Sequence, residues 1–216
     1  DRETLDTQLN VFESFDPEIP ASYRDTPFVF LANIHPALQL KVLEQVKAPK
    51  LVCLDTMNFW IEGEREALGK VLSRVQALLI NDEELRLLSG EHNMVRGAAK
   101  VRAMGPKILV VKRGDAGALL FDDHGMFCVP AVPLDNVVDP TGAGDTFAGG
   151  FVSFLANQGE VTPTTLRQAM VYGSVVASYS VEDFSLDALR TLTREDALKR
   201  CDLFKELTRF EDVTLK

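Results

Sequence analysis

The chain has 216 residues, of which 46% are hydrophobic and 25% charged, and its formal net charge is -9. This composition can bury an ordinary core, and the acidic balance argues against nucleic acid or an anionic membrane surface as the main partner. The three cysteines are scattered without disulfide or metal-ligand spacing, and neither a long apolar run nor a signal peptide is visible, which together favour a cytoplasmic protein.

The beginning of the chain reads as the middle of a longer protein. It starts at Asp1 without a methionine. Residues 1–12 alternate polar and apolar side chains, which predicts an edge strand with Leu5, Leu9 and Val11 facing inward. A proline-rich connector follows over residues 13–27. We therefore expect an N-terminal part of the protein to precede this sequence.

Residues 28–112 alternate between short apolar runs and amphipathic segments. The runs predict buried strands at 28–32, 51–54, 77–80 and 107–112, and the segments predict helices at 37–47, 64–75, 82–89 and 95–104. This order predicts a parallel sheet with helices on both faces. In such sheets ligands bind at the carboxyl ends of the strands. Polar residues at or just after these ends are Asn33, Asp55, Asn58, Asn81, Glu84 and Lys112.

The second half of the chain changes pattern. Residues 116–121 and 125–130 predict a hairpin around a turn at 122–125. Helices are predicted from Phe147 to Ala156, from Pro163 towards Tyr179, and over a charged tail from Leu186 to Phe210. The chain shows no internal repeat and no linker, so we expect residues 1–216 to form a single domain.

The most informative run lies between the hairpin and the next helix, where residues 139–151 read DPTGAGDTFAGGF. The small residues Gly142, Ala143 and Gly144 leave backbone amides uncovered at a helix N-terminus, which makes an anion site. Asp145 places a carboxylate at its rim. Such a carboxylate can take a proton from an acceptor hydroxyl while the amides hold the charge of a transferring phosphoryl group. The alternative is that Asp145 only caps the helix.

This run closely resembles the C-terminal signature of the ribokinase-like carbohydrate kinases, the PfkB family. Two further segments resemble family motifs: residues 81–84 (NDEE) resemble Asn-x-x-Glu, and residues 112–117 (KRGDAG) resemble Lys-x-Gly-x-x-Gly. The resemblance implies a three-layer αβα fold with a mostly parallel sheet. The family's N-terminal portion and most of its lid are not covered, and residues 1–12 would be a remnant lid strand. The chain would thus be the part that handles nucleotide and phosphate.

The resemblance also implies roles for residues at the matching positions. Asp145 would be the general base, and Gly142, Ala143 and Gly144 the anion hole. Asn81 and Glu84 would hold Mg²⁺ and the nucleotide phosphates, largely through water. The alternative for this pair is a helix start, since acidic residues suit the first turn; we assign Asp82 and Glu83 to that role.

Other positions would contact the nucleotide or a second cation. Lys112 would supply charge to the phosphates, and the backbone at Gly114 and Gly117 would lie against the nucleotide. Asp139 and Thr141 would help to bind a monovalent cation such as K⁺, although Asp139 can equally cap its turn. The small residues of segment 172–184 would admit adenine, although a closely packed helix would use the same residues: Gly173, Ser174, Ala177 and Ser178.

The acceptor side is less well defined. Residues 55–60 (DTMNFW) are similar to an Asp-x-Asn-x-Arg segment of several family members, which makes Asp55 and Asn58 substrate-binding candidates. Asn58 comes one position late, and Phe59 and Trp60 stand where the arginine is expected, so the arginine role cannot be transferred to Arg65. Trp60 could be core or a pocket wall.

Together these features predict an ATP-dependent kinase that phosphorylates a hydroxyl of a sugar or sugar-like small molecule. The alternatives are a nucleoside kinase of the same family and a non-catalytic nucleotide-binding protein with this fold. The implied cofactors are ATP and Mg²⁺, with a monovalent cation such as K⁺ as a further candidate. The expected partners are a sugar or nucleoside and a second copy of the chain, paired through the lid.

Overall fold

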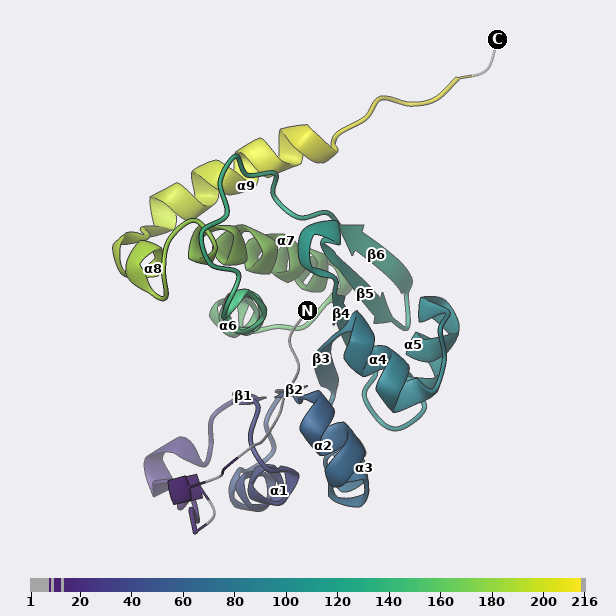
Figure 1. Cartoon of the computed structure of the whole chain (residues 1–216), viewed down its shortest axis with the longest axis vertical. Coiled ribbons are helices and arrows are strands. Elements are labelled where there is room, and N and C mark those ends of the chain that lie inside the picture. Colours follow the sequence, from purple (N-terminus) through teal and green to yellow (C-terminus); the bar gives the residue numbers. More distant parts are fainter. Residues whose placement is uncertain (1–7, 9, 13, 215–216) are drawn as a thin grey trace.

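The computed structural model describes residues 8, 10–12 and 14–214. Within this part, one sheet contains six strands in the order β1-β2-β3-β4-β5-β6 (Figure 1). Their bounds are β1 (Phe28–Leu31), β2 (Leu51–Asp55), β3 (Ala77–Asn81), β4 (Ile108–Lys112), β5 (Ala118–Asp122) and β6 (Gly125–Val129). The first four strands are parallel, and β5 and β6 form an antiparallel hairpin beside β4. The predicted mostly parallel sheet is confirmed.

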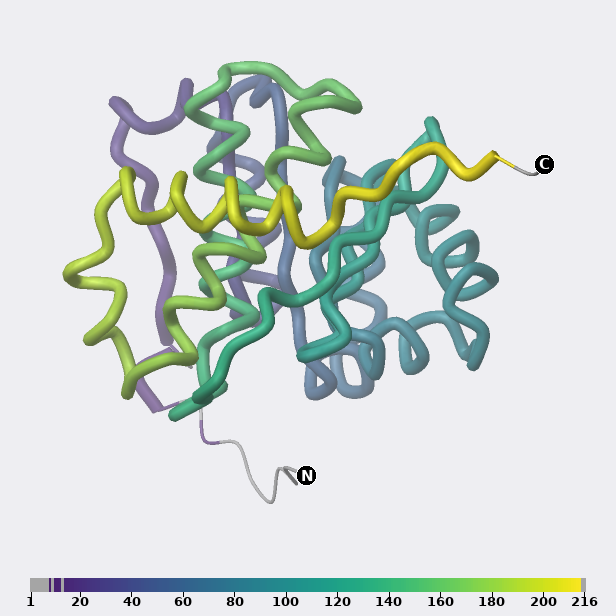
Figure 2. The backbone as a smooth tube through the Cα atoms, turned by 90° about the horizontal axis from the view of Figure 1, so that it is seen from above, coloured from purple at the N-terminus to yellow at the C-terminus, as the bar shows by residue number. Residues whose placement is uncertain are grey.

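Helices cover both faces of the sheet, as predicted for a three-layer fold (Figures 1 and 2). The helices packed on the first face are α1 (Pro36–Gln45), α3 (Arg65–Leu72), α4 (Asp82–Ser89) and α5 (Met94–Arg102). The main helices on the second face are α6 (Ala143–Gln158), α7 (Pro163–Ser180) and α9 (Arg194–Thr208), and the short α8 (Asp187–Thr191) contacts α7. Alternate side chains of β1 to β5 therefore point into two separate cores, whereas β6 contributes to one core and exposes Met126 and Cys128 on its other face.

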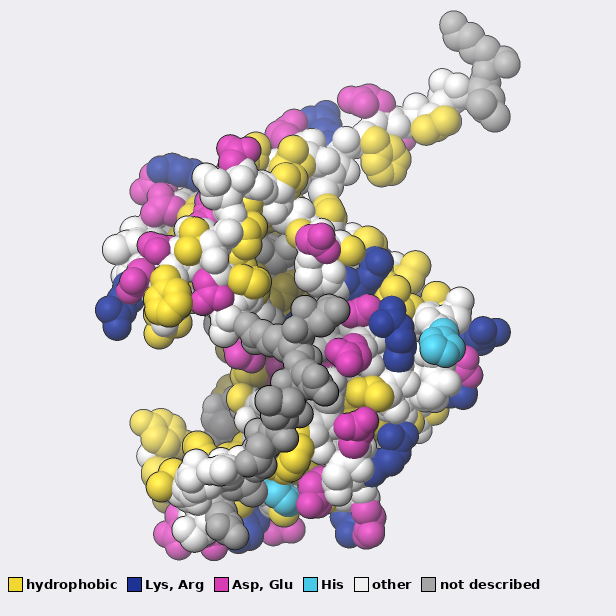
Figure 3. Space-filling model, viewed as in Figure 1, with side chains coloured by type: hydrophobic (Ala, Val, Ile, Leu, Met, Phe, Trp, Pro, Cys, Tyr) yellow, Lys and Arg dark blue, Asp and Glu magenta, His cyan; other side chains and the backbone are white. Residues whose placement is uncertain are grey.

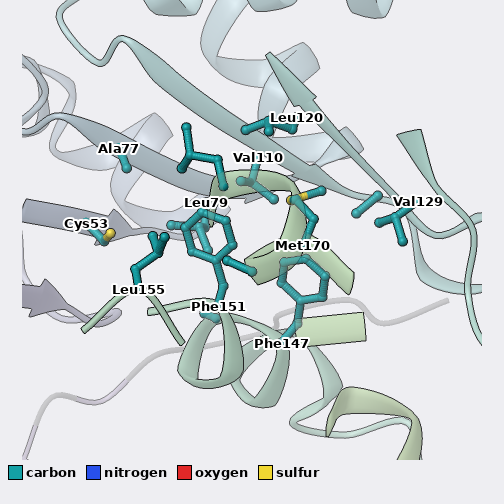
Figure 4. Packing of buried hydrophobic residues seen from close by; sticks show 14 of the residues in the cluster. Cys53, Ala77, Leu79, Val110, Leu120, Val129, Phe147, Phe151, Leu155 and Met170 are labelled. Atoms are coloured by element: carbon teal, nitrogen blue, oxygen red, sulfur yellow. The ribbon is translucent and has the colours of Figure 1, made fainter. Parts of the chain in front are cut away.

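The core of the second face fixes the position of α6. Phe147, Phe151 and Leu155 are buried at helical spacing and point towards the sheet (Figure 4). They belong to the same hydrophobic cluster as Leu79 and Val110 of the strands. Helices α6 and α7 approach closely because both carry glycine at the crossing, where a Cβ built on Gly150 would lie 3.0 Å from the Cα of Gly173. This packing holds the N-terminus of α6 near the carboxyl ends of the strands.

The start of the chain differs from the prediction. Residues 10–12 form a short 3₁₀ helix, η1 (Asn10–Phe12), rather than a strand, and Val11 is 79% exposed. The other expected inward positions, Leu5 and Leu9, lie outside the described residues, as do residues 1–7. Two other 3₁₀ turns are η2 (Ala21–Tyr23) and η3 (Gly114–Ala116). For residues 10–12, the strand predicted from alternating side chains is therefore wrong.

The structure also contains a helix that the sequence did not predict. Helix α2 (Asn58–Gly63) follows β2 directly and ends where α3 begins. At six residues it is too short to show a helical period in the sequence. None of the helices in the described residues combines the length and the apolar character that a membrane crossing requires.

Candidate active site

A buried carboxylate and a partly buried ammonium meet at the carboxyl ends of the strands. Lys112 ends β4 and Asp55 ends β2, and the Lys112 Nζ lies 3.1 Å from the Asp55 Oδ2. The two side chains are only 16% and 6% exposed. Moving a charge out of water costs free energy. Each member of this pair mainly offsets the desolvation cost of the other. A Cβ built on Gly144 would lie 3.4 Å from the same ammonium, which places Lys112 beside the first turn of α6.

Asp145 belongs to the same electrostatic cluster. Burial raises the pKa of Asp55 above its ordinary value, the Lys112 ammonium opposes this shift, and the negative charge of Asp145 adds to it. Asp145 directly follows Gly144, whose position lies beside the Lys112 ammonium, so the Asp145 residue lies next to the pair, and its own side chain is exposed. The structure therefore brings together an exposed carboxylate, a buried carboxylate and an ammonium group, as expected from their positions at strand and helix ends.

Asn81 and Glu84 form a reciprocal cap at the start of α4. The Asn81 Oδ1 accepts from the Glu84 amide (2.8 Å), and the Glu84 Oε2 accepts from the Asn81 amide (2.7 Å). Glu84 is only 8% exposed. Burial raises the pKa of Glu84 from 4.5 to about 7, against the opposing effects of the Asn81 amide and Lys112 and with a further rise from Asp55. The pair thus does cap a helix, and Glu84 also shares the field of the charged cluster.

The neighbouring acidic residues of α4 behave as surface groups. Asp82 pairs with Arg86 one turn along the helix (2.8 Å), and Glu83 is exposed.

The turn before α6 is built on glycine. Gly142 is the N-cap and adopts the left-handed conformation (φ 81°), and as a glycine it has no side chain with which to cap the helix. Asp145 is the third residue of the helix, so the interpretation of Asp145 as the helix cap is wrong. The Asp139 Oδ1 accepts from the Thr141 amide (2.9 Å), which is the turn-capping alternative proposed for Asp139. The Ala143 amide donates to the Pro140 carbonyl (3.2 Å), so it is partly committed to the turn rather than open to an anion.

A cavity of about 470 Å³ adjoins the charged cluster. Lys112 and Gly144 line it together with the last turns of α7 and the segment after β6. The residues that line the cavity include Gly114, Gly117, Val137, Ser174, Ala177, Ser178 and Val181. The walls are mainly apolar and small, as a flat heterocycle requires. Gly117 has a left-handed φ of 81°, and a Cβ there would lie 2.1 Å from the Val129 carbonyl oxygen, so glycine is needed at this turn.

One predicted pocket residue has a different place. A Cβ built on Gly173 would meet the Phe147 carbonyl oxygen at 2.8 Å, and Gly173 does not line the cavity. Its small size serves the contact between α6 and α7 rather than access for a base.

The segment after β2 contains buried polar atoms that sequence reasoning largely missed. Within the described residues, the Gln39 Oε1, Thr56 Oγ1 and Asn58 Oδ1 are buried without a hydrogen-bond partner. Gln39 lies on α1 and donates to the carbonyls of Ala32 (2.9 Å) and Asp55 (3.2 Å). Of the three residues the sequence singles out only Asn58, because Gln39 belongs to no motif and the resemblance assigns no role to Thr56, which follows β2.

The aromatic and basic residues of this segment serve the fold. Trp60 is 5% exposed, and its Nε1 donates to the Asn33 Oδ1 (2.9 Å), so Trp60 belongs to the core. The Arg65 guanidinium donates to the carbonyls of Leu87 and Leu88 at the end of α4. Arg65 is thus held by α4, in agreement with the conclusion that the arginine role cannot be transferred to it.

No three His, Cys, Asp or Glu side chains of the described residues lie close enough to form a protein-only metal site. The donors available near the cluster are single carboxylates and an amide. Such a sparse oxygen set fits Mg²⁺, which keeps several of its waters, better than a metal that needs a full set of protein ligands.

A partly buried lysine at strand ends, a glycine turn opening a helix and an adjoining apolar cavity are features of sites that bind phosphorylated nucleotides. The match to known proteins agrees with this class: the profile of the pfkB family carbohydrate kinases matches residues 38–191. The chain belongs to this family.

Individual relatives include kinases of nucleosides and sugars. The cytidine kinase of Thermococcus kodakarensis is 35% identical over 141 residues, covering 62% of this chain and 50% of that protein. The nucleoside kinase of Methanocaldococcus jannaschii has the same fold, with a TM-score of 0.71 and 21% identity over 90% of this chain and 60% of that one. A ribokinase of Arabidopsis thaliana, solved with ribose and ATP, gives a TM-score of 0.68 and 24% identity over 81% of this chain and 55% of that one. The chain spans about half the length of the curated relatives it matches.

Proposed function

We propose that the protein is an ATP-dependent kinase that transfers a phosphoryl group to a hydroxyl of a sugar or nucleoside. The observation that carries this proposal is the contact of Lys112 with both Asp55 and the first turn of α6, next to a cavity of suitable size. An ammonium and helix-end amides in one place favour the multiply charged phosphates of a nucleotide. Family membership and the ribokinase solved with ATP support the same nucleotide.

In this proposal each residue of the candidate site has a defined role. The cavity holds adenine, and the turn at Gly142 and Gly144 directs helix-end amides at the transferring phosphoryl group. Asp145 takes the proton from the acceptor hydroxyl as its oxygen bonds to phosphorus and the bond from phosphorus to the ADP oxygen breaks. Lys112 compensates the charge of the phosphates. ATP supplies the phosphoryl group, and Mg²⁺, when bound, neutralises the phosphate charge.

The cations would bind at the edges of this arrangement. Glu84 and Asn81 are the candidates for holding Mg²⁺ through its waters, since Glu84 lies within the field of Lys112 and Asp55. Asp139 and Thr141 are the candidates for a monovalent cation such as K⁺ beside the glycine turn.

The acceptor is the second part of the proposal. Asp55 and Asn58 are the candidate acceptor residues, and the buried oxygen of Asn58 has an unused capacity to accept a hydrogen bond. The relationship to a cytidine kinase and a nucleoside kinase makes a nucleoside the second candidate beside a free sugar. A panel of pentoses, hexoses, sugar acids and nucleosides, assayed with ATP and Mg²⁺, distinguishes the two.

The test of the mechanism is Asp145→Asn, which preserves shape and removes the base. We expect turnover to fall by about 10²–10⁴-fold, the usual contribution of a positioned general base. ADP binding, measured by calorimetry, should change little. If the variant keeps wild-type turnover, Asp145 is not the base. If the wild-type protein binds ADP but phosphorylates no acceptor in the panel, a non-catalytic nucleotide-binding role is favoured.

A further inference from the structure

Arg200 on α9 contacts the end of α7 in three ways. Its Nη1 donates to the Ser178 Oγ (2.8 Å) and to the Glu182 Oε2 (2.6 Å), and the guanidinium carbon lies 3.4 Å from the centroid of the Tyr179 ring. The Tyr179 hydroxyl donates in return to the Asp196 carbonyl on α9 (3.0 Å). The Arg200 side chain is only 18% exposed. A planar, permanently charged group that stacks and donates at the same time suits arginine and not lysine.

The residues that Arg200 holds form part of the cavity wall. Ser178 lines the cavity, and its own hydroxyl donates to the Val175 carbonyl (2.6 Å). Because Ser178 donates to Val175 and accepts from Arg200, the orientation of its hydroxyl is fixed from both sides. Three residues further on, Val181 lines the cavity at the point where α7 ends.

A continuous set of hydrogen bonds then leads from α7 to the glycine turn. The Val181 carbonyl accepts from the Val138 amide (2.8 Å) and the Asp139 amide (3.4 Å). Asp139 in turn accepts from the Thr141 amide (2.9 Å), directly before the N-cap of α6 at Gly142. The last turn of α7 therefore supports both the apolar cavity and the turn that carries the helix-end amides.

We propose that Arg200 is a positioning residue for nucleotide binding: from α9, it fixes the end of α7 and, through it, the cavity wall and the glycine turn. Arg200 does not itself line the cavity. It acts by keeping the wall in its binding geometry before the nucleotide arrives, which lowers the ordering cost of binding. Its positive charge at the C-terminal end of α7 also complements the helix dipole there. This inference rests on the proposed function of the cavity as the nucleotide site.

The test is ADP binding in the presence of Mg²⁺, measured by calorimetry on the whole chain. We expect Arg200→Ala to weaken ADP binding by about tenfold, because a charged hydrogen bond and a stacked contact that order the wall are lost. Arg200→Lys keeps the charge without the planar fork and should lie between wild type and Arg200→Ala. Glu182→Gln, which weakens the hold on Arg200 from outside the cavity, should act in the same direction with a smaller effect.

The matched control is Lys199→Ala on the same helix. Lys199 is exposed and pairs with Glu195 one turn away (2.8 Å). Its removal should leave ADP affinity within about twofold of wild type, as for a surface ion pair. Thermal unfolding without ligand is measured for every variant, since a purely structural role of Arg200 would lower the melting temperature and leave the affinity of the folded protein unchanged.

The outcomes separate the two proposals. If wild type binds ADP and both Arg200 variants bind it equally well, the positioning role is wrong and the nucleotide site stands. If wild type does not bind ADP, the nucleotide site itself is wrong, and the positioning role with it. If Arg200→Ala does not fold, Arg200→Lys and Glu182→Gln decide in its place. Once an acceptor is known, the variants should raise the KM for ATP more than they change kcat.

Discussion

Glu84→Gln should stabilise the protein at alkaline pH while impairing the proposed chemistry. Glu84 is buried in the capping box of α4, and burial raises its pKa from 4.5 to about 7. A glutamine keeps the shape and an oxygen that can accept from the Asn81 amide, and it carries no charge to be desolvated. The substitution therefore isolates the cost of the buried charge from the contribution of the cap.

The sign of the effect follows from proton linkage. The native state binds the Glu84 proton more tightly than the unfolded state, so the associated stability is fully present below pH 4.5 and is lost as the pH rises to about 7. At about 1.36 kcal/mol for each pKa unit, the ionised carboxylate lowers the free energy of unfolding by about 3 kcal/mol above pH 8. Glu84→Gln should recover this amount at pH 8.5 and gain almost nothing at pH 4.

The assay is urea unfolding at a series of pH values from 4 to 8.5, at constant ionic strength and with a chelator to remove divalent cations. With a slope of about 2–3 kcal/mol/M, the midpoint of Glu84→Gln should exceed that of wild type by about 1 M at high pH. Glu83→Gln is the matched control, because Glu83 is exposed on the same helical turn and its replacement should change stability by less than about 0.5 kcal/mol. A difference between Glu84→Gln and wild type that is constant with pH would refute the reasoning.

Two other predictions concern the same edge of the sheet and the helix pair behind it. Lys112→Met leaves Asp55 buried without its ion-pair partner and should destabilise the protein by about 3–5 kcal/mol in urea unfolding, whereas adding Asp55→Asn should restore most of that loss. A double variant no more stable than Lys112→Met would contradict the importance of charge compensation. Gly150→Ala places a Cβ 3.0 Å from the Gly173 Cα and should cost about 1–3 kcal/mol, seen as a lower melting temperature. Gly149→Ala, where the Cβ meets open space, should instead stabilise α6 by about 0.5–1 kcal/mol; equal effects of the two alanines would show that α6 and α7 can separate at little cost.

Most of the architecture could be predicted because hydrophobic period and element order determine it. The strands at residues 51–55 and 77–81 are buried apolar runs up to their last residue, which is polar, and their alternation with helices leaves a parallel sheet as the simple solution. Where the local signal was weak, prediction failed. Helix α2 has too few residues to show a period, and the alternation around Val11 corresponds to an exposed 3₁₀ helix rather than a strand.

The site was partly predictable for a different reason. Asn81, Glu84, Lys112 and the turn before α6 could be found because strand ends converge at one edge of a parallel sheet and because their residues form recognisable motifs. The ion pair of Lys112 with Asp55 could not be derived, since it joins residues 57 positions apart and depends on the register of three strands. Gln39 and Arg200 belong to no motif, and only the packing of their helices brings Gln39 to the strand ends and Arg200 into contact with Ser178 of the cavity wall.

Charged side chains of both signs are interspersed among the described residues of the face in Figure 3. A protein with an acidic net charge can still hold a local positive group. Here the largely covered Lys112 ammonium at the strand ends is such a group. An anionic ligand would approach a surface with charges of both signs and would bind near the Lys112 ammonium at the strand ends. Binding should accordingly depend less on salt than it would for a nucleotide held by surface lysines.

The connection between α6 and α7 lies at the amino ends of the strands, whereas the charged cluster lies at their carboxyl ends. The Lys50 Nζ, directly before β2, donates to the Gly159 carbonyl at the end of α6 (3.1 Å), which fixes this connection at the amino ends of the strands. The chain could therefore be opened there, or a reporter domain inserted, at a distance from the proposed chemistry. The proposed active site and a position that should tolerate cleavage or insertion therefore lie at opposite ends of the strands.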